Sequence, residues 1–121
     1  MTLAIWFGVM VMGGFGALAR FALDRAVNQR VGRPFPFGTL AVNASGACLL
    51  GFLAGLALSP QVALVVGTGF VGSYTTFSTW MLETQRLSEE RQLRPAVANI
   101  IVSLVLGLVA AWLGLWIGGR L

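Results

Sequence analysis

The sequence predicts an all-α membrane protein with four transmembrane helices and a break in the third. Hydrophobic residues make up 57% of the chain and charged residues 10%, whereas a soluble domain carries about 25% charge. Residues 34–82 contain no charge over 49 positions, although one helical crossing needs only ~20 residues. Three glycines and a cluster of hydroxyl side chains in residues 67–80 allow the backbone to break, which membrane depth tolerates only inside protein or beside a polar cavity.

The 121 residues are expected to form one domain. The expected spans cover about residues 3–23, 37–58, 62–82 and 95–118. Pro60 and its neighbours supply the turn between the second and third spans, and residues 24–36 form a loop after the first. Both loops that follow the odd-numbered spans then lie on one side of the membrane, and both termini lie on the other.

Residues 83–94 are expected to continue the third span as a helix in water. Glu83–Arg86 and Glu90–Arg94 have the spacing of ion pairs along a helix, with the acid on the N-terminal side. These charges therefore predict a solvated helix face.

Arginine supplies every basic side chain of the chain, and the net charge is +4. The arginines lie near span ends, where membrane topology explains them better than nucleic-acid binding does, so we expect no nucleic-acid partner. The positive-inside rule places both loops in the cytoplasm because they hold six of the arginines, while Arg120 lies on the opposite side. The six are Arg25, Arg30, Arg33, Arg86, Arg91 and Arg94.

Small residues four apart recur in three of the expected spans. The sets are Gly13–Ala17, Gly51–Gly55 and Ala110–Gly114–Gly118. This spacing lets the backbones of membrane helices approach closely. The three sets therefore predict tight packing between helices.

The chain lacks the residues that most enzyme sites use. It has no histidine, no lysine and one cysteine, Cys48, so it offers no cluster for a transition metal and no acid–base pair. Gly67, Gly69 and Gly72 match the spacing of a dinucleotide-binding loop, but the long uncharged run excludes the helix-covered sheet that this loop requires. We expect no enzyme activity.

Polar side chains recur at helical spacing in two spans. Thr39 and Asn43 lie four apart in the second span, and Asn99 and Ser103 lie four apart in the fourth. Such tracks either form hydrogen bonds between helices or line a pore. The expected break in the third span favours the pore.

Charged groups are almost absent from the interiors of the expected spans. The acids lie at span ends or in loops, whereas a proton-coupled exporter generally needs a titratable group at membrane depth. Arg20 is the exception near a span's interior. Its guanidinium either reaches the lipid headgroups or lines an aqueous vestibule that attracts anions.

Three segments together resemble the CrcB/Fluc family of fluoride channels. They are GFGALARF at residues 14–21, GTLAVNASG at residues 38–46 and GFVGSYTTFST at residues 69–79. The resemblance implies a passive fluoride-selective channel in the bacterial inner membrane, with two antiparallel, inverted subunits enclosing two pores. It also implies a structural sodium ion at the dimer centre, held by the main-chain carbonyls of Gly72 and Thr75 from each subunit.

The resemblance also assigns pore residues. Fluoride needs donors that replace its hydration water, and aromatic ring edges carry partial positive charge. The expected pore residues are Asn43, Phe77, Trp80, Ser103, Thr39, Thr76, Thr79 and Asn99, with Arg20 in the vestibule. Trp80 stands where the family pattern has phenylalanine, and its indole N–H is a further candidate donor to the ion. Asn99 stands where relatives often carry tyrosine.

Two alternative functions and the identity of the partner remain open at this point. A small multidrug-type proton-coupled exporter also has four short spans, but it needs a glutamate within the first, and residues 3–19 are uncharged. A non-transporting assembly subunit would not need the hydroxyl block at Thr75–Thr79. The arginine bias also leaves open whether the inverted partner is a second copy of this chain or an oppositely oriented homologue.

Overall fold

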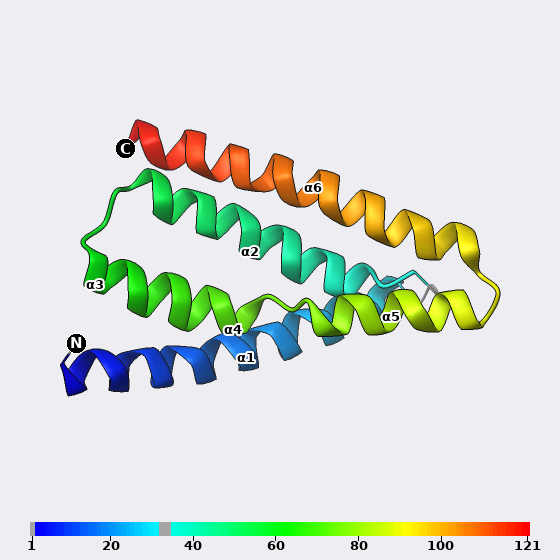
Figure 1. The fold of residues 1–121 in the computed structure, drawn as a ribbon, viewed down its shortest axis with the longest axis horizontal. Helices are drawn as coiled ribbons and strands as arrows, with labels where there is room; N and C mark the ends of the chain where they lie inside the picture. Colours follow the sequence, from blue (N-terminus) through cyan, green and yellow to red (C-terminus); the bar gives the residue numbers. More distant parts are fainter. Residues whose placement is uncertain (1, 32–34) are drawn as a thin grey trace.

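The computed structural model describes residues 2–31 and 35–121, and every regular element in these ranges is a helix (Figure 1). Three of the helices are long and apolar enough to cross a membrane: α1 (Leu3–Val31), α2 (Phe37–Gly55) and α6 (Leu93–Arg120). Between α2 and α6 the chain forms α3 (Pro60–Ala63), the π-helix η1 (Leu64–Val71), α4 (Gly72–Tyr74) and α5 (Ser78–Glu89). The all-helical class predicted from the sequence is confirmed.

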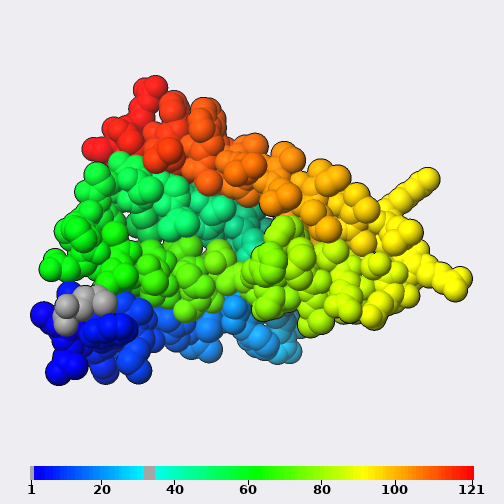
Figure 2. Space-filling view, in the orientation of Figure 1, coloured from blue at the N-terminus to red at the C-terminus, as the bar shows by residue number. Residues whose placement is uncertain are grey.

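The long helices lie roughly side by side, with both termini at one end of the molecule (Figure 1). The end of α1, the start of α2 and the α5–α6 turn lie at the other end. Helix α2 packs against α6 and α1, and α1 packs against η1 and α4. Figure 2 shows α6, α2 and the α3–α5 segment adjoining one another across one face of the molecule.

Helix α1 is longer than the expected first span and continues to Val31. Residues 24–31 contain no glycine or proline, so the backbone has no local reason to leave the helix. The longer helix brings Asn28 to the start of α2, where Asn28 Oδ1 accepts the N–H of Gly38 over 3.0 Å. A side chain from α1 therefore satisfies one free donor at the N-terminus of α2. Arg33 and Pro34, assigned above to the loop, lie outside the described residues.

Glycines bring α2 and α6 into backbone contact. A Cβ on Gly114 would lie 1.9 Å from the carbonyl oxygen of Cys48, and one on Gly118 would lie 2.3 Å from that of Phe52. From the other side, a Cβ on Gly51 would lie 2.1 Å from the carbonyl oxygen of Ala111. Two of the small-residue sets found in the sequence therefore meet each other in this interface.

The segment expected to form the third span, called here the third crossing, is interrupted at Thr75–Phe77, where the sequence predicts a break. Thr75 is extended, with φ −81° and ψ 158°, and the helix resumes at Ser78. Before the break, η1 runs as a π-helix through Gly67 and Gly69. Such wide turns are rare and are frequently found at functional sites.

The segment after α5 differs from the expected continuous extension. Helix α5 ends at Glu89, and Arg91 adopts a positive φ of 60° before α6 begins. The N–H of Gln92 bonds back to the carbonyl of Leu87, which closes the helix end. In the described part of the chain the ion pair is Arg86–Glu90, at 3.9 Å, in place of the two expected pairs.

Candidate functional site

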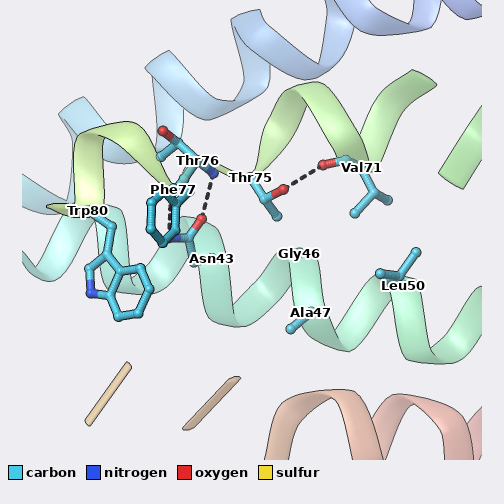
Figure 3. A pocket seen from close by; sticks show the side chains of 9 residues that line it. All are labelled: Asn43, Gly46, Ala47, Leu50, Val71, Thr75, Thr76, Phe77 and Trp80. Atoms are coloured by element: carbon cyan, nitrogen blue, oxygen red, sulfur yellow. Dashed lines mark hydrogen bonds between the residues drawn. The ribbon is translucent and has the colours of Figure 1, made fainter. Parts of the chain in front are cut away.

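Asn43 of α2 holds the break in the third crossing. Its Nδ2 donates to the carbonyl of Thr76, and its Oδ1 accepts the N–H of Thr76, both over 2.8 Å (Figure 3). A side-chain amide can pair with a main-chain amide in this way because each offers one donor and one acceptor. The pair fixes the direction of the Asn43 amide and leaves its second Nδ2–H for another acceptor.

The break also frees the two carbonyls that were predicted to hold sodium. In a continuous helix the N–H of Thr76 would bond Gly72 and the N–H of Thr79 would bond Thr75. Here the first donates to Asn43 Oδ1, and the second donates to Thr76 Oγ1 over 3.2 Å. Gly72 is exposed, and both residues line a shallow depression of about 360 Å³. Carbonyl oxygens are suitable ligands for a hard cation, so these residues fit a sodium ion.

An open groove, called here the aromatic groove, lies beside the break. It has a volume of about 310 Å³ and is lined by the nine residues labelled in Figure 3. Phe77 is 70% exposed, and its ring meets that of Trp80 edge to face, with centroids 5.7 Å apart. The groove therefore combines aromatic edges with the Asn43 amide.

A second groove, called here the arginine groove, lies between α1, α2 and the start of α5. Its volume is about 210 Å³. Arg20 and Asp24 of α1 line it together with Thr39, Thr76 and Thr79. Because Thr76 lines both grooves, the residues predicted from the sequence meet at the break from two sides.

Asn99 and Ser103 are placed differently from the other predicted pore residues. Within the described residues they line neither groove. The side chain of Asn99 is completely buried and donates to Thr84 Oγ1 over 2.8 Å, while Ser103 Oγ donates to Asn99 Oδ1 over 3.4 Å. The indole N–H of Trp80 donates to the Asn99 carbonyl over 3.2 Å, so the structure uses this N–H within the protein.

Glu83 is a polar residue of the site that the sequence analysis did not select. Its carboxylate accepts a hydrogen bond from Thr39 Oγ1 across 44 positions of sequence. Glu83 lies just beyond the expected third span, where burial raises the pKa of its carboxyl above the ordinary value, against the lowering effect of the Thr39 hydrogen bond. Its position at the end of an expected span gave no sign of this contact. Only the packing of α2 beside α5 brings Thr39 to Glu83.

Comparison with known proteins relates this site to a family. Residues 7–115 match the family described as "CrcB-like protein, Camphor Resistance (CrcB)". A Mycobacterium bovis protein named "Fluoride-specific ion channel FluC 2" is 66% identical over 97% of this chain and 93% of its own length. A Leifsonia xyli protein named "Fluoride-specific ion channel FluC 1" is 43% identical over 98% of this chain and 90% of its own length. The chain therefore belongs to the CrcB family.

Proposed function

We propose that this chain is a passive, fluoride-selective ion channel of the bacterial inner membrane, which lowers cytoplasmic fluoride by letting the anion leave. The relatives named as fluoride channels support this function. The observation that carries the proposal is the aromatic groove, where the oriented amide of Asn43 lies beside the rings of Phe77 and Trp80.

Fluoride binds its hydration water strongly, so a selective path has to replace that water with donors of fixed direction. The Oδ1 atom of Asn43 is committed to the N–H of Thr76, which keeps the amide from turning its oxygen toward an anion. The ring edge of Phe77 adds partial positive charge without a titratable group. Together they favour a small anion over chloride.

The arginine groove is the proposed vestibule. Arg20 lies in its wall together with Asp24, and the proposed role of the Arg20 guanidinium is to raise the local concentration of anions in this confined polar space. Thr79 offers a hydroxyl group in the same wall, whereas the Thr39 hydroxyl donates to Glu83. The path from this vestibule to the aromatic groove leads past Thr76, which lines both.

The working assembly is proposed to be an inverted dimer with a structural sodium ion at its centre. The carbonyls of Gly72 and Thr75 are available to such an ion because their helical donors are used elsewhere. An ion shared between two broken helices would join the loosened backbones of both subunits. The partner is proposed to be a second copy of this chain. The arginine bias favours the other possibility, an oppositely oriented homologue.

A proton-coupled exporter is the competing function. It requires a carboxylate within a span, whereas Asp24 and Glu83 are half-buried acids that lie just beyond the expected spans. The arrangement of aromatic edges and an oriented amide supports the channel instead.

Efflux from liposomes that hold the purified protein alone tests the proposal, with fluoride and chloride electrodes as readout. We expect rapid fluoride release without chloride release. Phe77→Leu should abolish fluoride release, because it removes the ring edge from the groove. Phe15→Leu is the matched control, since Phe15 is 58% exposed on α1 and does not line the groove. Equal loss in both variants would contradict the proposal. No release by folded wild-type protein would point to an obligate inverted partner or contradict the channel.

A further inference from the structure

Trp80 is attached to its surroundings at both its ring and its main chain. The ring Nε1–H donates to the main-chain carbonyl of Asn99 in α6 over 3.2 Å. The carbonyl of Trp80 accepts from Thr84 Oγ1 over 2.9 Å and from Asn99 Nδ2 over 3.5 Å. One end of the indole is therefore fixed to α6, while the residue also lines the aromatic groove.

Asn99 is at the centre of this arrangement. Its side chain is 0% exposed, and its Nδ2 group makes both of its hydrogen bonds to atoms of α5, namely Thr84 Oγ1 and the Trp80 carbonyl. A buried amide whose donors are all paired is costly to disturb. Its donors are used to hold α5 against α6 and are not directed into either groove.

The position of Phe77 follows from that of Trp80. The Phe77 ring stands at 81° to the indole plane, in edge-to-face contact. Because Phe77 is 70% exposed, this contact is a principal restraint on its ring. Asn99 and Thr84 therefore restrain Trp80, and Trp80 in turn restrains the ring of Phe77.

We propose that Asn99 and Thr84 are positioning residues that hold the Trp80 ring, and through it the Phe77 ring, at the geometry by which the aromatic groove selects fluoride. The effect on selectivity rests on the function proposed above, whereas the attachment of the ring is a property of the fold. Trp80 and Asn99 act as one unit in which the indole N–H bonds to protein and only ring carbon faces the ion.

Fluorescence of Trp80 tests the attachment without any transport. Replacing Trp6, Trp112 and Trp116 by Phe leaves Trp80 as the single indole, and each of the three is at least 50% exposed, so their loss spares the core. The variants to compare in this full-length background are Asn99→Leu, Thr84→Val and the control Ser88→Ala, which is exposed on the same helix as Thr84.

We expect acrylamide to quench Trp80 more strongly in Asn99→Leu and Thr84→Val. Both variants keep the Asn99 main-chain carbonyl that accepts the indole N–H, but they lose side-chain bonds that hold Trp80 and α5 to α6, so the ring becomes more accessible. The Ser88→Ala control should match the parent protein. Thr84→Val preserves shape and provides the test if Asn99→Leu does not fold. Unchanged quenching in a folded variant that lacks the Asn99 or Thr84 side-chain bonds would overturn the proposal.

Transport then tests the consequence for the ion. Asn99→Leu should lower the ratio of fluoride to chloride efflux about fivefold or more, the effect expected from one lost hydrogen bond. The same substitution made on top of Trp80→Phe should have a much smaller effect, since the two act through one ring. Additive losses would overturn the positioning role. If the wild-type protein alone passes no fluoride, the proposal of a homodimeric channel fails, while quenching still decides the attachment.

Discussion

Asn43 combines the two roles that a polar residue can have in a membrane helix. Its amide bonds the main chain of Thr76 in both directions, which makes it a structural support of the break. The same pairing orients its remaining N–H, which makes it a candidate donor to an anion in the aromatic groove. One residue therefore couples the shape of the backbone to the chemistry of the proposed pore.

Asn43→Asp removes the amide donor, which serves in both roles, and keeps the acceptor. The carboxylate can still accept the N–H of Thr76, but it has no N–H to donate and it repels both the Thr76 carbonyl and fluoride. We expect fluoride efflux to fall by roughly tenfold or more, corresponding to about 1.4 kcal/mol or more. Initial rates from the fluoride electrode measure this. An unchanged rate in protein that elutes as wild type does would show that fluoride efflux does not need the Asn43 N–H.

Glycines decide how closely the helices approach, and their surroundings differ along a single helix. Gly114 of α6 faces the backbone of α2, whereas a Cβ on Gly107 of the same helix would meet nothing within 4 Å. Seven residues make nearly two full turns, so both glycines lie on the same face of α6 and differ in their position along its axis. Two glycines of the same helix therefore contribute differently to helix packing.

Gly114→Ala and Gly107→Ala form a matched pair at this scale. The first would put a methyl group 1.9 Å from the carbonyl oxygen of Cys48, so the helices must separate. We expect a loss of about 1–3 kcal/mol of stability, as for other overpacked contacts. Gly107→Ala should leave stability equal or raise it, because alanine favours the helix. Thermal unfolding in detergent compares them, and equal melting temperatures would contradict the close contact.

The whole subunit exposes a large apolar surface. Phe7 and Met10 of α1 and Leu108 of α6 are 69%, 73% and 72% exposed. Lipid or a second subunit has to cover such an area. Arg25 and Arg30 near the end of α1, and Arg86, Arg91 and Arg94 around the α5–α6 turn, lie toward the end opposite the termini. Arg120 lies at the end of α6, beside the termini. The orientation of the chain in the membrane therefore bears directly on the assembly.

Cysteine labelling on intact cells measures that orientation. In a Cys48→Ser background, Ser88→Cys reports the end with the α5–α6 turn, and Leu121→Cys reports the end with the termini. A homodimer of inverted copies predicts that a membrane-impermeant maleimide labels about half of the chains at either position. Labelling of Leu121→Cys alone would mean a fixed orientation and would require an inverted homologue as the partner.

Removal of sodium tests the proposed ion. Exchange of Na⁺ for N-methylglucamine at constant ionic strength should lower the melting temperature, because an ion that binds only the folded protein stabilises it. Potassium should restore less of the loss than sodium does if the carbonyls of Gly72 and Thr75 close around the smaller ion. Identical melting curves in all three salts would count against a bound sodium ion.

Much of the site could be predicted from sequence because its chemistry is local. Glycines and hydroxyl groups in residues 67–80 predict a break, and the break lies at Thr75–Phe77. The spacing of Thr39 and Asn43 predicts a shared polar face of one helix. The structure turns that face toward the third crossing and its extension, where both side chains form hydrogen bonds. These patterns depend on helical period and backbone freedom, which adjacent residues determine.

Long-range pairing could not be predicted in the same way. The sequence makes Trp80, Asn99 and Ser103 look like separate polar positions of a pore, while the packing of α5 on α6 joins them in one hydrogen-bonded group. Glu83 appears as a surface charge until Thr39 lies against it. Composition and period thus determine the all-helical class, the long apolar helices and the place of the break in the expected third span. Only the tertiary structure decides which polar group bonds which, because a hydrogen bond requires a distance between atoms that sequence spacing along two different helices does not define.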